Sequence, residues 1–180
     1  AAFACGVAVL AISATAVDAL QVRPRSNRFE DRIVDDPTNG LDVATTPLGS
    51  LSAADGLRVA WNSFRTAHGP EWSITLDRRS GAPLLAEGKG LPWPVAKDAG
   101  IDALAASLRE FIAGHRSLLL ADDAELVLSR DASGPLQDDV WQIVFDRVVS
   151  GIPVEGERYM FTIGHGRLIS FGAPRWSRID

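Results

Sequence analysis

The segment VWQIVFDRVVSGIPVEGERYMFTIGHGRLISFGAPRWSR, residues 140–178, decides how the chain folds. In two parts of it, Trp141–Phe145 and Tyr159–Ile163, large apolar side chains occupy every second position. Because successive side chains of a β-strand point to opposite faces of the sheet, this spacing predicts two strands that each have one apolar face.

Turn signals connect these two strands with each other and with a third. Gly164–Gly166 predicts a tight hairpin, since glycine adopts a positive φ without steric strain, and a third strand follows at Leu168–Phe171. Ser150–Gly156 lies between the first two strands. It predicts a wide turn or a bulge, because its proline cannot donate a hydrogen bond within a sheet. Together these signals predict an antiparallel meander of three strands.

Two segments upstream have the spacing of amphipathic helices. Leu51–His68 begins near Ser52, a residue type that caps helix N-termini, and it ends before Gly69 and Pro70. Asp98–Arg116 is the stronger pattern, with Asp98 as its expected cap. The apolar faces consist of Leu57, Ala60, Trp61 and Phe64 in the first helix, and of Ile101, Leu104, Leu108, Phe111 and Ile112 in the second.

Shorter elements are expected between the helices and the meander. Trp72–Glu87 predicts a hairpin with its turn at Asp77–Gly81, and Gly88–Pro94 predicts a loop. Glu125–Ser129 predicts a strand, and Asp131–Asp139 a polar turn region. This order of elements predicts an α+β fold, in which one main helix packs on one face of an antiparallel sheet.

The residue types from Val140 to Gly172 resemble the end of a fungalysin/thermolysin-type propeptide (FTP) domain. In that family an aromatic-rich strand leads into a Gly-[Ile/Val]-Pro-Val-x-Gly turn, here Gly151–Gly156. A hairpin and a Gly-x-[Leu/Val]-x-Ser-x-Gly strand follow, here Gly166–Gly172. The likeness extends more loosely from about Trp72 onward. It implies a cystatin-like sheet in the N-terminal pro-region of a secreted zinc metallopeptidase, a region that assists folding of the protease and inhibits it.

The first 19 residues are small and apolar, and no charge precedes Asp18. This composition is typical of a secretory signal peptide, and Val17-Asp18-Ala19 fits the small-x-small cleavage rule, so we expect cleavage after Ala19. A membrane anchor is the alternative, although an alanine-rich run of about 17 residues is at the lower limit of spanning length. We expect residues 20–50 to form an irregular, flexible leader, residues 51–180 to form the pro-domain, and the protein to be secreted or periplasmic.

Composition restricts the partners and the chemistry of the chain. A formal net charge of −5 argues against nucleic acid or an anionic membrane as the main partner. The single cysteine, Cys5, excludes an internal disulfide. The three histidines, His68, His115 and His165, are expected at two helix ends and a hairpin tip, without the short ligand spacing of zinc sites. No Gly-x-Ser-x-Gly motif or Cys–His pair suggests catalysis, so we expect no metal, no cofactor and no enzymatic activity.

The residues expected to contact a partner lie in turns and loops. Glu155 and Glu157 flank a glycine beside Pro153, where two carboxylates are either solvated or in contact with a cationic partner. Trp93 and Trp176 fall outside the regular elements, so they either contact a partner or fold back on the core.

The leading hypothesis for the function is a non-catalytic propeptide domain. Its partner would be a metallopeptidase domain of the same precursor, which it would help to fold and would inhibit. The alternative is an exported protein-binding module that has no attached protease. A His-Glu-x-x-His motif downstream of Asp180 in the gene would favour the first hypothesis.

Overall fold

A single antiparallel sheet of eight strands forms the centre of the fold in the computed structural model, which describes residues 45–95 and 99–177. The strands run in the order β1-β2-β3-β8-β7-β6-β4, and β5 also pairs with β6. Every strand pair is antiparallel. The strands are β1 Thr45–Pro47, β2 Ser73–Asp77, β3 Pro83–Pro92, β4 Leu126–Leu128, β5 Gly134–Gln137, β6 Val140–Val149, β7 Ile152–Gly164 and β8 Arg167–Gly172.

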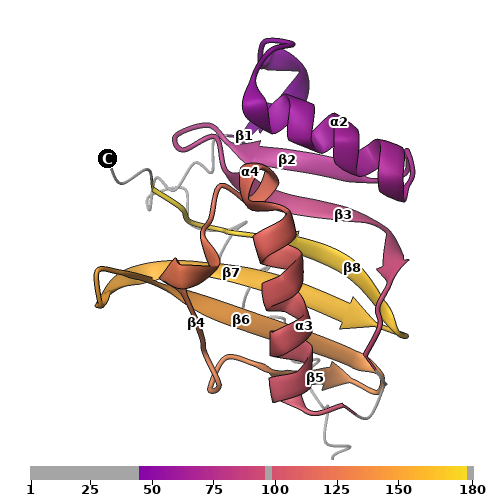
Figure 1. The fold of residues 1–180 in the computed structure, drawn as a ribbon, viewed down its shortest axis with the longest axis vertical. Helices are drawn as coiled ribbons and strands as arrows, with labels where there is room; N and C mark the ends of the chain where they lie inside the picture. The colour runs from indigo at the N-terminus through magenta and orange to yellow at the C-terminus, as the bar shows by residue number, and fades with distance from the viewer. Residues whose placement is uncertain (1–44, 96–98, 178–180) are drawn as a thin grey trace, which may run out of the picture. The chain divides into compact units, whose positions relative to one another are not determined.

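The helices lie on one face of this sheet (Figure 1). They are α2 Gly56–His68, α3 Ile101–Gly114 and α4 Arg116–Leu119, with 3-10 turns at Leu48–Ser50 and Asp123–Glu125. α3 crosses the strands of the meander, and α2 lies beside β2 and β3. The predicted α+β class is therefore confirmed, as is the predicted meander of β6, β7 and β8.

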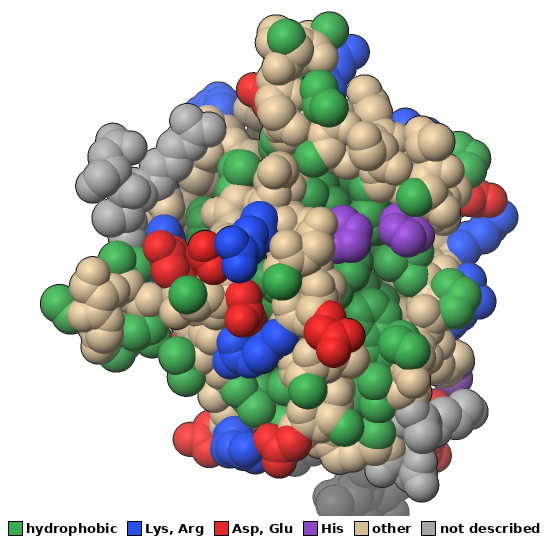
Figure 2. Space-filling model, viewed as in Figure 1, with side chains coloured by type: hydrophobic (Ala, Val, Ile, Leu, Met, Phe, Trp, Pro, Cys, Tyr) green, Lys and Arg blue, Asp and Glu red, His purple; other side chains and the backbone are tan. Residues whose placement is uncertain are grey.

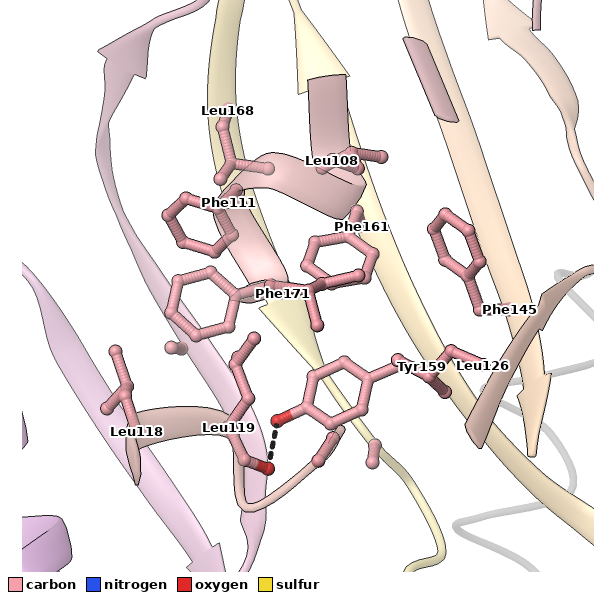
Figure 3. Close-up of a cluster of buried hydrophobic side chains, with 14 of the residues drawn as sticks. Leu108, Phe111, Leu118, Leu119, Leu126, Phe145, Tyr159, Phe161, Leu168 and Phe171 are labelled. Carbon is pink, nitrogen blue, oxygen red and sulfur yellow. Dashed lines mark hydrogen bonds between the residues drawn. The ribbon is translucent and has the colours of Figure 1, made fainter. Parts of the chain in front are cut away.

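The core between α3 and the meander is aromatic (Figure 3). Phe161 lies at its centre, with its ring centroid 5.9 Å from that of Phe145 and 6.3 Å from that of Phe111 on α3. Tyr159 is also fully buried, and its hydroxyl donates a hydrogen bond to the carbonyl oxygen of Leu119 at 3.1 Å. The alternation predicted for these strands is thus confirmed, with two exceptions: Trp141 is only half-buried at the margin of the core, and Val144, on the opposite face of β6, is also buried.

Several predicted boundaries are wrong. The first helix begins at Gly56 with Asp55 as its N-cap, not at Ser52, because the Asp55 carboxylate accepts hydrogen bonds from the N–H groups of Leu57 and Arg58. Thr45–Ser50, expected in the leader, contains β1 and a 3-10 turn. The main helix begins at Ile101, and its expected cap, Asp98, lies outside the described residues.

Two predicted loops contain sheet. β3 continues through Gly88 to Pro92, where it pairs with β8 after an irregularity between Glu87 and Leu91. Gly134–Gln137, inside the expected polar turn region, is β5 and pairs with β6. In both cases the pairing with a neighbouring strand outweighs the turn preference of glycine and proline. Within residues 45–95 and 99–177, no helix has both the length and the apolar character needed to span a membrane.

Candidate partner-binding site

One end of the β6–β7 hairpin projects beyond the rest of the sheet. Val149 pairs with Ile152 and Val148 pairs with Pro153, around a two-residue turn. Among the described strands, β4 pairs with β6 only as far as Arg147, and β8 pairs with β7 only as far as Met160. Residues 148–153, which we name the hairpin arm, therefore project from the sheet as a two-stranded ribbon (Figure 1).

The turn of the arm is much tighter than predicted. Ser150 and Gly151 both have positive φ, 52° and 80°, as in the two-residue turns that match the twist of a hairpin. The expected wide turn over Ser150–Gly156 is therefore wrong. Pro153 lies within strand β7. It is accommodated there because this part of β7 is an edge whose N–H groups need no partner from β8.

The expected bulge is present at the base of the arm. Asp146 pairs with Arg158 and Val148 with Pro153, so a single residue of β6, Arg147, faces four residues of β7. Gly156 adopts a φ of 75° there, and a Cβ atom on it would lie 3.0 Å from Nη1 of Arg175. The positive φ favours glycine at this position, and the bulge turns the chain inward before Glu157.

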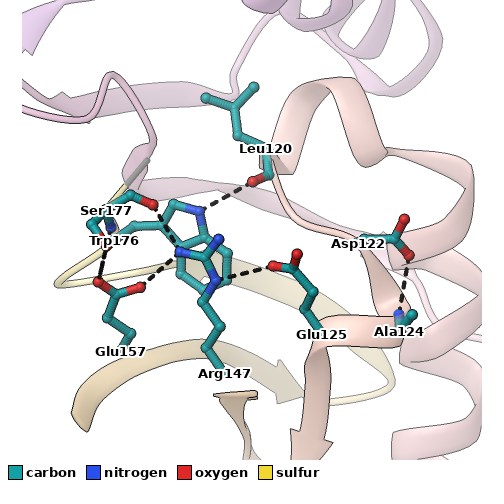
Figure 4. A network of polar contacts seen from close by, with 8 residues as sticks. All are labelled: Leu120, Asp122, Ala124, Glu125, Arg147, Glu157, Trp176 and Ser177. Atoms are coloured by element: carbon teal, nitrogen blue, oxygen red, sulfur yellow. Dashed lines mark hydrogen bonds and ion pairs between the residues drawn. The ribbon is translucent and has the colours of Figure 1, made fainter. Parts of the chain in front are cut away.

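A buried ion pair fixes this base (Figure 4). Nη1 of Arg147 donates to Oε2 of Glu157 at 2.8 Å, and its Nε donates to Oε2 of Glu125 at 3.0 Å. Arg147 and Glu157 are each only 5% exposed. Because a buried charge is strongly disfavoured without a partner, this geometry joins β6 and β7 to the 3-10 turn that precedes β4.

The Arg147–Glu157 pair also holds the segment that follows β8, which contains Trp176 and Ser177. Nη1 of Arg147 also donates to the carbonyl oxygen of Ser177 at 2.7 Å, and Glu157 accepts hydrogen bonds from the N–H and the hydroxyl of Ser177. The Arg147 guanidinium lies 4.3 Å from the ring centroid of Trp176, a cation–π contact. The indole N–H of Trp176 donates to the carbonyl oxygen of Leu120 at 3.1 Å. This segment is therefore docked across the end of the core.

Trp93 is also turned inward. Its indole N–H donates to the hydroxyl of Ser107 on α3 at 2.8 Å, and its ring lies 5.8 Å from that of Phe111. The backbone N–H of Trp93 donates to the carbonyl oxygen of Gly166 at 2.8 Å. Trp93 therefore joins the end of β3 to α3 and to the β7–β8 turn.

The structure divides the five predicted contact residues into two groups. Pro153 and Glu155 are exposed, on the arm and its bulge. Glu157 and Trp176 are buried in the network of Arg147, and Trp93 is half-buried, so the expectation that Glu157 is exposed is wrong. The sequence analysis missed Ile152, which is 69% exposed at the tip of the arm. Its position directly before a proline and after a turn glycine is the signal that could have identified it.

This arrangement is suited to contact with another protein. The arm exposes apolar side chains and unpaired strand edges, and the adjoining bulge exposes the acid Glu155; these are groups that contact another protein. Burial raises the pKa of the Tyr159 hydroxyl, so that hydroxyl stays protonated. Within the described ranges, no three histidine, cysteine or acidic side chains gather in a way that could hold a metal ion.

In comparisons with known proteins, no family model, no curated protein and no solved structure matches this chain.

Proposed function

We propose that this chain is a non-catalytic propeptide domain of a secreted zinc metallopeptidase precursor, where it assists folding of the protease and inhibits it. The observation that carries the proposal is the hairpin arm. It projects from the sheet with Ile152 and Pro153 exposed, and it lies in the same Gly151–Gly156 segment whose residue types resemble the FTP pattern.

The rigid base of the arm favours tight association. The Arg147–Glu157 pair and the two-residue turn hold the arm in one conformation before any partner binds. Binding then requires little ordering of the chain, which is a large part of the free energy that usually opposes association. Exposed apolar side chains beside a polar rim are typical of protein interfaces, and here Glu155 supplies the rim.

Inhibition would follow from the location of such an interface. A stable complex needs about 800 Å² of buried surface on each partner, more than the arm alone offers. The arm would therefore act together with the neighbouring sheet, where Val127 of β4 is also exposed. An interface of this size at the mouth of a protease cleft would block access of substrate.

Assistance to folding would follow from the same binding. A domain that binds the native protease and not the unfolded chain stabilises the native state by mass action. A domain on the same precursor acts at a high effective concentration, because the two are covalently linked.

We also propose a more specific fold and an export route for the chain. We infer a cystatin-like arrangement, which is supported by one long helix, α3, across a meander of consecutive antiparallel strands. We also infer export of the chain through a signal peptide at residues 1–19, which lie outside the described part of the structure.

The proposal is tested by adding the purified chain to a thermolysin-like zinc metallopeptidase. We expect slower hydrolysis of a small peptide substrate at micromolar concentrations of the chain, and a one-to-one complex by size-exclusion chromatography. Full activity together with no complex would contradict the proposal. A complex that leaves hydrolysis unchanged would instead support the alternative, an exported binding module.

A further inference from the structure

Two histidines that are far apart in the sequence meet on the helical face of the molecule. His68 is the last residue of α2, and His115 lies between α3 and α4. Their ring centroids are 6.2 Å apart. Figure 2 shows the two imidazoles side by side, in purple, on this face, and both line a hollow between α2 and the α3–α4 junction.

The ring of His115 is fixed in position by its neighbours. It stacks on Phe111 with a centroid distance of 4.2 Å, and it lies edge-on to Phe64 at 5.7 Å. Its Nδ1 is 2.8 Å from the carbonyl oxygen of Phe111. A carbonyl oxygen can only accept, so Nδ1 carries a hydrogen and the lone pair of the neutral ring is on Nε2. Histidines that bind metals are oriented by this same kind of hydrogen bond.

The two rings line a shared hollow that contains few charged groups. The hollow has a volume of about 550 Å³, and its lining contains no carboxylate. The lining includes the charged side chain of Arg116, whose guanidinium lies 3.5 Å from the carboxylate of Asp122. Neutral imidazole is the form that binds metal ions.

We propose that His68 and His115 together bind one late first-row transition-metal ion, with Zn²⁺ as the physiological candidate. Imidazole nitrogen is a preferred ligand of zinc, copper and nickel, whereas magnesium and calcium prefer oxygen ligands. Two rings that share a tetrahedral zinc ion through bonds of about 2.0–2.1 Å have centroids about 5 Å apart. The observed 6.2 Å is about 1 Å longer, so the exposed His68 side chain must rotate toward His115 to complete the pair.

The site has two protein ligands, because the described residues contain no group of three potential ligands. Water fills the other positions of the four that zinc prefers, so the ion binds reversibly and stays open to an additional ligand. The ion joins the C-terminal end of α2 to the α3–α4 junction. It therefore stabilises the folded state by mass action.

Calorimetric titration of the full chain with Zn²⁺ near pH 7.5 tests the site. Every protein in the test carries Cys5→Ser, because the chain's only thiol is a competing zinc ligand. We expect one ion per chain and a rise in melting temperature with added zinc. His68→Phe and His115→Phe preserve the ring contacts and remove the nitrogens, and each is expected to weaken zinc binding at least tenfold. Mg²⁺ is expected to give no binding heat.

His165→Asn is the matched control, because it removes the third histidine of the chain at a turn position with a φ of 52°, which asparagine tolerates. It is expected to leave the zinc affinity unchanged. The proposal is overturned if the Cys5→Ser parent binds no zinc, if both phenylalanine variants bind as this parent does, or if the control loses affinity as they do. Nitrogen-15 NMR gives an independent check, since zinc should shift the Nε2 resonance of His115 and leave that of His165 in place.

Discussion

Arg147 has the largest structural role of any single residue near the proposed binding surface. It faces the bulge of β7, forms ion pairs with Glu125 and Glu157, and contacts the ring of Trp176. Its side chain is almost fully buried, so its charge is compensated by the protein and not by water. The position of the arm therefore depends on this residue.

We predict that Arg147→Met lowers the free energy of unfolding by about 3–5 kcal/mol, since it leaves the buried carboxylate of Glu157 without its cation. Urea denaturation followed by circular dichroism measures the change. Arg158→Met is the matched control, because Arg158 forms a 3.2 Å pair with Asp146 in which both side chains are partly exposed. Its effect is expected to stay below about 1 kcal/mol. Equal effects of the two variants would show that the Arg147 network does not stabilise the fold.

The inward position of Glu157 and Trp176 could not be predicted from the sequence. An acid beside a turn glycine is usually solvated, and a tryptophan after a proline has no periodic pattern that identifies its face. Both residues are buried because of contacts over long sequence separations: Arg147 is ten residues before Glu157, and Leu120 is 56 before Trp176. Only Pro153 and Glu155 are exposed as predicted, although both lie in β7 and not in the predicted turn.

At the scale of elements, α2 shows how a local signal can be assigned to the wrong residue. Ser52 and Asp55 are both good capping residues, and the sequence pattern fits a helix that begins at either. The structure selects Asp55, whose Oδ1 is 2.9 Å from the N–H of Leu57. Leu51 lies outside the helix, and its carbonyl oxygen accepts a hydrogen bond from Arg58.

Replacement of the two candidate caps distinguishes them. We predict that Asp55→Ala lowers the free energy of unfolding by about 0.5–2 kcal/mol, because two N–H groups of the first turn lose their acceptor. Ser52→Ala is expected to change it by less than about 0.5 kcal/mol, as is usual for an exposed surface position. Thermal or urea unfolding of the two variants provides the measurement. A larger effect at Ser52 would place the cap where the sequence alone suggested.

At the scale of the whole molecule, the strands with clear alternation were predictable, and the edge strand β4 was predicted at Glu125–Ser129, whereas β1 and β5 were not predicted. Tyr159–Ile163 has a period of two that only a strand explains, and its pairing with β6 and β8 follows from two short turns. β1 and β5 contain glycine, proline and threonine, with no apolar alternation. They are strands because a neighbouring strand offers hydrogen bonds, and that information is not local.

Export of the chain is a further prediction at this scale. The small, uncharged residues before Asp18 lead us to expect that mass spectrometry of the exported protein finds Leu20 as its first residue. A mature protein that still contains Cys5 would contradict cleavage after Ala19.

The central claim is that the hairpin arm is the surface that binds and inhibits a zinc metallopeptidase. The most direct measurement compares the inhibition constants of two variants that carry the same type of substitution at different positions. Ile152→Asp places a charge at the tip of the arm, and Leu136→Asp places one on β5, at a site that is 57% exposed compared with 69% for Ile152. Both should fold as wild type does, since both side chains are at the surface.

We predict that Ile152→Asp weakens inhibition of a thermolysin-like enzyme at least about 30-fold, which corresponds to the 2 kcal/mol or more that defines a hot spot. Leu136→Asp is expected to inhibit as wild type does. Equal inhibition by the two variants, or a selective loss with Leu136→Asp, would contradict the claim that the arm is the binding surface.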